Sequence, residues 1–183
     1  MLPAPVAELW SFDRTVQHAA FTAYIQIADH PVDWAYTIWD DLDTHLTSPD
    51  NHDRAIAAQL LCCLAKSDPE KRIFAVFDRL ITVVYDERFV TARHTLQALW
   101  QIAVVSESLQ DKVLSALEDR FMNCVTHKNC TLIRYDIAVV LRKIYDISQT
   151  PNLVPFAEQL AVVEIDEQYR KKYLSVFRSA KAK

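Results

Sequence analysis

The chain has 183 residues, of which 51% are hydrophobic and 24% are charged, and its formal net charge is −4. These values are typical of a globular protein with a sizeable core. The chain contains no glycine, the residue that supplies positive φ angles in tight hairpins and in phosphate-binding loops. Primed hairpin turns, Walker loops and dinucleotide-binding fingerprints are therefore excluded, and helices joined by short polar turns are favoured.

Apolar residues recur at helical spacing along the whole chain, and prolines and polar turns divide the pattern. A first helix is predicted within residues 11–31, with Ser11 or Asp13 as its cap and its end before Pro31. Six further helices are expected as three pairs, at about 32–46 with 52–66, 69–84 with 87–105, and 108–126 with 131–147. Pro69 is expected at the first helical position of its helix. A short helix at 152–163 and a last one at 165–179 complete the prediction.

A repeat becomes visible when the second helix of each pair is aligned on an arginine. Arg54 begins RAIAAQLLCCL, Arg93 begins RHTLQALWQIA, and Arg134 begins RYDIAVVLRKI. The spacings of 39 and 41 residues are close to the ~40–47 residues of HEAT and armadillo units. One such pair cannot bury its apolar face alone, so this period predicts stacked helix pairs with capping helices at both ends.

The middle unit resembles a HEAT repeat, because Asp86 lies in the turn between its helices and Arg93 lies early in its second helix. The resemblance covers about residues 33–147 and implies an all-α fold, a short right-handed α-solenoid of antiparallel helix pairs. We expect one HEAT-like domain over 1–183, divided into a capping helix at 11–31, helix-pair repeats at 32–67, 69–106 and 108–148, and a C-terminal cap at 152–183. The resemblance also implies structural ion pairs for four repeat positions, Arg54, Asp86, Arg93 and Arg134. The series of Asp–Arg pairs is incomplete, because His127 and Thr47 replace the aspartate in the other two units.

HEAT-like stacks commonly bind partners on the concave face that their second helices line. The resemblance therefore implies a non-catalytic scaffold or adaptor without a cofactor, which binds a protein or peptide through His94, Gln97, Gln101, Tyr135 and Arg142. The competing interpretation is that these are solvated helix positions. In the first unit the equivalent positions are apolar, and we expect the N-terminal helix to cover them.

Two other functions are weighed. Some alkylpurine DNA glycosylases resemble HEAT stacks, and Trp100, Tyr135 and Asp136 are the residues to consider for such a DNA-binding or repair protein; phycobilin lyases also resemble HEAT stacks. Nucleic acid is disfavoured, because 24 acidic residues outnumber 20 basic ones and all the acidic residues lie before residue 168. The basic C-terminal segment could contact an acidic partner, nucleic acid or an anionic membrane through Arg170, Lys171, Lys172 and Arg178, or could be a cap with a solvated basic face.

The four cysteines are not interpreted as a disulfide framework, because Cys62 and Cys63 are adjacent and the chain is large enough to fold without covalent links. No signal peptide and no apolar run of ~20 residues is recognised, so we predict a cytoplasmic protein. Two metal-capable groups, Cys124-x2-His127-x2-Cys130 and the Asp41/His45 pair, are interpreted as helix and turn residues without a metal, since structural zinc sites need four ligands.

Overall fold

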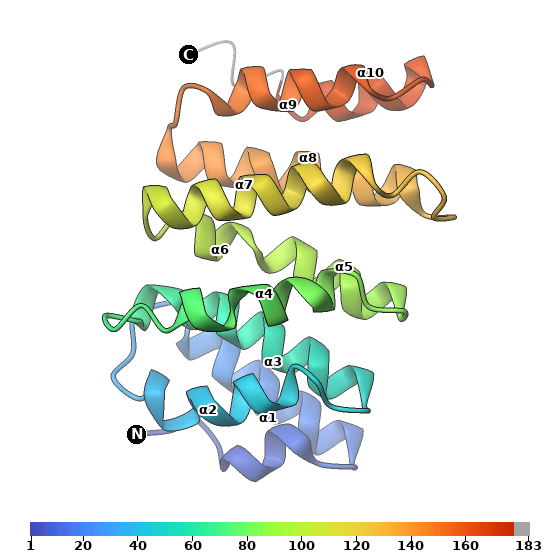
Figure 1. The fold of residues 1–183 in the computed structure, drawn as a ribbon. Helices are drawn as coiled ribbons and strands as arrows, with labels where there is room; N and C mark the ends of the chain where they lie inside the picture. Colours follow the sequence, from blue (N-terminus) through green and yellow to red (C-terminus); the bar gives the residue numbers. More distant parts are fainter. Residues whose placement is uncertain (178–183) are drawn as a thin grey trace. The chain divides into compact units, whose positions relative to one another are not determined.

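The computed structural model describes residues 1–177 and contains only helices, turns and loops in that range. The chain divides into two compact units, residues 1–101 and residues 102–183. Figure 1 shows the helices of both units. Among residues 1–177, no helix combines the length and the apolar character that crossing a membrane requires.

Unit 1 contains an N-terminal cap followed by two helix pairs. Its elements are η1 (Val6–Trp10), α1 (Arg14–Ile27), α2 (Ala35–His45), α3 (Asn51–Leu64), η2 (Ala65–Ser67), α4 (Ile73–Val84), α5 (Phe89–Ala98) and the start of α6 (Trp100–Ala103). Helix α2 packs against α3, and α4 packs against α5, while α3 and α5 pack against each other and α1 lies on α3. Within unit 1, each first helix therefore packs against the second helix that follows it in the sequence.

The core of unit 1 follows from the apolar spacing of its sequence. Trp34, Ile38, Leu42 and Leu46 stand four residues apart and are all buried, because positions i and i+4 share one face of a helix. They face α3, whose Leu60 and Leu61 are completely buried. Helix α3 is thus buried from several sides, as is expected of a helix inside a stack.

The helix boundaries differ from the prediction most clearly at α4. The Asp13 side chain caps α1, as predicted, by accepting hydrogen bonds from the backbone N–H groups of Thr15 and Val16. Pro69 does not begin α4, which starts at Ile73. The reason is the buried Asp68 carboxylate, which accepts the backbone N–H groups of residues 72 and 73, while Lys71 adopts a positive φ of 58°. The helix predicted at 87–105 is interrupted at Leu99, between α5 and α6.

Unit 2 continues the pattern with α7 (Glu107–Met122), α8 (Cys130–Ser148), α9 (Leu153–Val162) and α10 (Glu167–Ser175). Helix α7 packs against α8, and α8 also packs against α9 and α10. Ser106 caps α7 and Asp166 caps α10 through their side chains. Ile133, Ile137 and Ile144 form part of the buried face of α8. Arg178, from the predicted basic segment, lies outside the described residues.

Candidate functional site: a groove on the second-helix face

An open hollow of unit 1 lies between α1, α3 and α5. It has a volume of about 440 Å³ and is lined by Arg14, Gln17, His18, Phe21, Asn51, His52, Ala55, Ile56, Gln59, Val90, Thr91 and His94. A second hollow of about 240 Å³ shares Phe21, Gln59 and His94 with the first and adds Ile25, Cys63, Gln97, Ala98, Trp100 and Gln101. We call the two together the α3–α5 groove. Three of the five residues predicted to bind a partner lie in it: His94, Gln97 and Gln101.

The local structure explains why these side chains share the groove. His94, Gln97 and Gln101 are separated by three and four residues, a spacing that places side chains on one side of a helical segment. In the first repeat, Ala58 and Cys62 occupy aligned positions and are completely buried, on a helix that α1 contacts. Ala55, the third aligned position, is partly exposed and lines the groove, so α1 covers this apolar face in part and the groove is the part that it leaves open.

The groove combines apolar surface with neutral hydrogen-bonding groups. Val90 is 61% exposed, and Phe21 is partly exposed beside it in the lining. Gln59 donates to the backbone carbonyl of Ala55 at 3.0 Å. Arg14 forms an ion pair with Asp50 and donates to Gln17 at 2.7 Å. Because its guanidinium is already paired, the groove offers amides and apolar contacts more than net charge.

The chemistry of Cys63, which also lines the groove, is that of a neutral thiol. Burial raises the pKa of Cys63, and a hydrogen bond with Gln101 opposes that rise only in part. Cys62 is completely buried, and its pKa is raised further. A thiolate is the reactive form of cysteine, so the arrangement does not activate either residue as a nucleophile.

The two predicted partner-binding residues of unit 2 contact its C-terminal segment. The ammonium group of Lys172 lies 4.6 Å from the ring centroid of Tyr135. Arg142 donates to the backbone carbonyl of Val176 at 3.0 Å and pairs with Asp146 at 2.8 Å. The structure thus gives both residues a packing role against α10 and the turn that follows it. In the same segment, Lys171 pairs with Glu167 at 2.8 Å.

The Arg54–Asp86 pair joins the first repeat to the turn of the second. The guanidinium donates to the carboxylate twice, at 2.5 Å and 3.0 Å, and also to the Ser48 carbonyl at 2.7 Å. The Asp86 side chain is 4% exposed. Burial raises the pKa of Asp86, but the hydrogen bonds from Arg54 and from the Arg88 backbone outweigh it and hold this pKa below its ordinary 3.8. Arg93 lies on the next second helix and is partly exposed.

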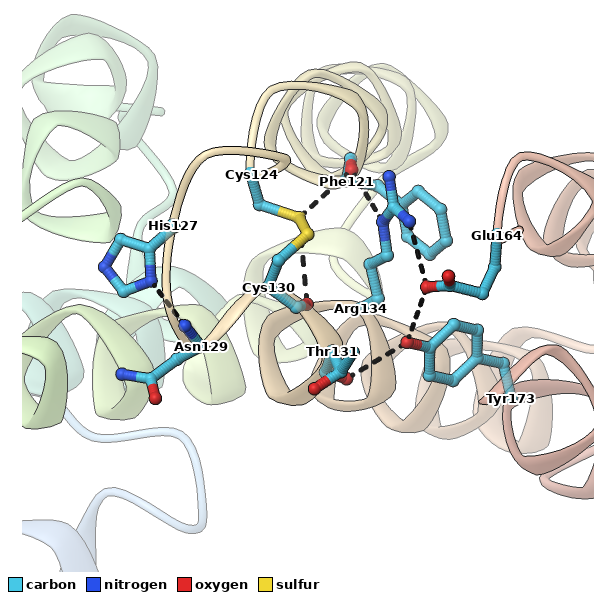
Figure 2. Close-up of a disulfide and its surroundings, with 9 residues drawn as sticks. All are labelled: Phe121, Cys124, His127, Asn129, Cys130, Thr131, Arg134, Glu164 and Tyr173. Atoms are coloured by element: carbon cyan, nitrogen blue, oxygen red, sulfur yellow. Dashed lines mark hydrogen bonds and ion pairs between the residues drawn. A yellow bond between two sulfur atoms is a disulfide. The ribbon is translucent and has the colours of Figure 1, made fainter. Parts of the chain in front are cut away.

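A second, more deeply buried pair lies in unit 2 (Figure 2). Arg134 pairs with Glu164 at 2.9 Å, and both side chains are less than 10% exposed. Tyr173 donates to Glu164 at 3.1 Å and to the Thr131 carbonyl at 3.2 Å. Burial raises the pKa of Glu164, but the hydrogen bonds, the strongest from Arg134, bring it below 4.5. The alignment singled out Arg134 but not Glu164, because the partner lies in the cap, outside the repeat.

The interpretation of the cysteines needs a correction. Cys124 and Cys130 form a disulfide with a Cα–Cα distance of 5.0 Å, whereas Cys62 and Cys63 are free. The turn between α7 and α8 brings the two residues into the 4.4–6.8 Å range that a disulfide needs, and spacing in the sequence alone does not show this. The bond joins one local turn and is not a framework for the fold.

The other metal-capable pair anchors the N-terminal segment. Asp41 accepts a hydrogen bond from the Trp10 indole at 2.6 Å, and the His45 ring stacks on Trp10 with centroids 3.6 Å apart. Within the described part of the chain, no group of three or more His, Cys, Asp or Glu side chains is placed to hold a metal ion. Of the three residues considered for the glycosylase-like alternative, Trp100 lines the α3–α5 groove, Asp136 is buried, and the Tyr135 ring is engaged by Lys172.

Comparison with known proteins adds only structural similarity. No family model matches the chain, and no curated protein matches it. Two engineered proteins solved by the Northeast Structural Genomics Consortium are similar in structure, each with a TM-score of 0.48. The first is 21% identical, and the match covers 95% of this chain and 78% of that protein. The second is 20% identical, and the match covers 94% of this chain and 46% of that protein. A designed armadillo repeat protein is 14% identical, with a TM-score of 0.47, and covers 97% of this chain and 100% of its own. By the helix pairing within each unit, the fold is that of a HEAT/armadillo-like α-solenoid.

Proposed function

We propose that this protein is a non-catalytic interaction scaffold that holds a short segment of another protein in the α3–α5 groove. The observation that carries the proposal is that two open hollows adjoin each other on the second-helix face. The two hollows share Phe21, Gln59 and His94, and the helices α1, α3, α5 and α6 contribute side chains to them. Two adjoining hollows suit an extended segment of chain better than a compact small molecule.

The composition of the groove supports the same kind of ligand. A bound peptide presents backbone amides and carbonyls along its length and side chains at intervals, so its site needs hydrogen-bonding groups beside apolar pockets. Gln59, Gln97 and Gln101 supply amides that both donate and accept. Phe21 and Val90 supply apolar contact next to them. We therefore expect an anchoring aliphatic or aromatic side chain in the partner segment.

The test compares two triple variants in a pull-down from native extract. The groove variant carries His94→Ala, Gln97→Ala and Gln101→Ala. The control carries Thr37→Ala, Asp78→Ala and Thr82→Ala, which are exposed residues of α2 and α4 outside the groove. Both variants should keep the wild-type melting temperature within a few degrees, because neither replaces a fully buried side chain.

The expected result is loss of the captured partner from the groove variant only. A fluorescent peptide cut from that partner should then bind the groove variant at least ~10-fold more weakly, which corresponds to about 1.4 kcal/mol. Equal capture by wild type, control and groove variant would reject the groove as the binding site. Partner binding that depends on Tyr135→Ala or Arg142→Ala, with unchanged melting, would move the site to unit 2.

A further inference from the structure

The Cys124–Cys130 disulfide closes the turn between α7 and α8 (Figure 2). Its two ends differ in accessibility. Cys124 is completely buried, whereas Cys130 is partly exposed. Cys130 is also the first residue of the 19-residue helix α8. Exchange requires a thiolate to reach one of the two sulfurs, so the turn directs an attacking thiol to Cys130.

The surroundings also suit the reduced form. The Cys124 sulfur lies 3.4 Å from the Phe121 carbonyl oxygen and 3.7 Å from the Cys130 carbonyl oxygen. A disulfide sulfur carries no hydrogen, so these oxygens can serve as acceptors only for the thiol. The thiol of Cys130 would lie at a helix N-terminus, where the thiolate form is favoured. Both cysteines therefore have a suitable environment after the bond is broken.

The same turn holds the contacts that fasten α10. The Phe121 carbonyl, which faces the Cys124 sulfur, also accepts a hydrogen bond from Arg134 at 3.2 Å. Arg134 holds Glu164, and Glu164 accepts from Tyr173 of α10. Tyr173 donates as well to the Thr131 carbonyl, one residue after Cys130. The disulfide therefore holds the start of α8, where Thr131 in the first turn makes one of these contacts and Arg134 in the next turn makes two.

We propose that Cys124–Cys130 is a reversible thiol–disulfide exchange site for dithiols, and that its reduction loosens α10 from α8. One thiolate of the dithiol attacks the Cys130 sulfur, the S–S bond breaks, and Cys124 leaves as a thiolate that takes a proton from water. The second thiolate of the dithiol then attacks the other dithiol sulfur, which is bonded to Cys130 in the mixed disulfide. Cys130 leaves and is protonated, and the dithiol departs as a cyclic disulfide, having given two electrons to the protein.

The first test uses dithiothreitol on the folded full-length protein without denaturant. Samples are quenched in acid, unfolded and alkylated, and labels at each cysteine are counted by mass spectrometry. Cys62 and Cys63 are free and should be labelled in every sample, which makes them the internal reference. We expect two further labels, at Cys124 and Cys130, to appear as dithiothreitol increases. If these labels appear only when denaturant accompanies the reductant, the exchange site is rejected.

The second test measures hydrogen exchange in oxidised and reduced protein. Amides of residues 167–175 should exchange several-fold faster after reduction, while those of residues 1–101 should not change. Cys130→Ser should show the faster exchange without reductant and no further response to it. Cys63→Ser retains the disulfide and should respond to dithiothreitol as wild type does. Reduction that leaves exchange in 167–175 unchanged would overturn the link to α10.

Discussion

At the scale of single residues, the Arg54–Asp86 pair is the contact whose loss should cost most in unit 1. Asp86→Ala removes a nearly buried carboxylate and leaves the Arg54 guanidinium without its main acceptor. Breaking such a pair from one side should lower the free energy of unfolding by about 3 kcal/mol. Urea denaturation measures the loss. Asp78→Ala, at an exposed position of α4, is the control and should stay within about 0.5 kcal/mol of wild type.

The paired carboxylates also predict how stability depends on pH. The pKa values of Asp50, Asp86 and Glu164 are raised by burial but lowered more by their hydrogen bonds and cationic partners, to below 3.8, 3.8 and 4.5. A carboxyl with a lower pKa in the folded state stabilises the fold above its unfolded pKa, and this contribution disappears as pH falls through the folded pKa.

We therefore expect the free energy of unfolding to fall as the pH decreases from about 5 to about 3. Asp86→Asn should make this decline shallower, because it removes one of the groups that titrate differently in the two states. Urea midpoints at pH 6, 5, 4 and 3 test both statements. An identical pH profile for the variant would show that Asp86 does not contribute.

Some of these residues could be predicted from the sequence and others could not. Arg54 and Arg134 stood out because they recur at the period of the repeat. Glu164 did not, because it follows α9 and has no counterpart in the other units. The pairing of Cys124 with Cys130 depends on the path of one turn, which no periodic pattern describes. Contacts that repeat leave a trace in the sequence, whereas contacts of a single turn or of a cap do not.

At the scale of helices, the order of elements followed from apolar spacing, but the start of α4 did not. A proline followed by good helix-forming residues indicated a start at Pro69. The structure begins the helix at Ile73, because the buried Asp68 carboxylate binds the first backbone N–H groups and residues 69–72 form a turn. Helix propensity is a weak preference, and a buried acceptor that satisfies orphan N–H groups overrides it.

That turn gives a prediction about Lys71, which has a φ of 58°. β-Branched residues are disfavoured in the left-handed region, whereas asparagine tolerates it. Lys71→Val should therefore lower the free energy of unfolding by about 1 kcal/mol. Lys71→Asn should leave it unchanged or raise it slightly. Thermal and urea denaturation of the two variants would decide, and equal stability would contradict a left-handed Lys71.

At the scale of the whole molecule, a stack of repeats predicts that a destabilising substitution lowers stability mainly in its own unit. Each helix pair depends mainly on its neighbours, so stability is close to a sum of nearest-neighbour terms. Asp86→Ala should increase hydrogen exchange in unit 1, and Glu164→Ala should increase it in unit 2. Both should be measured by peptide-resolved hydrogen exchange at neutral pH. Uniform acceleration over both units in either variant would instead indicate one cooperative fold, which the expectation of a single domain over 1–183 implies.

The buried pair between Arg134 and Glu164 has a consequence for any attempt to shorten or recombine this chain. A fragment that ends after α8 would keep a guanidinium in the interior and lose the carboxylate that neutralises it. Such a fragment would have to hydrate that charge by opening its own end, so its last helix pair would be a target for proteases. The smallest transferable module at this end of the chain is therefore α7 through α10, and the last two helices cannot be exchanged for a generic cap unless the cap supplies an acid.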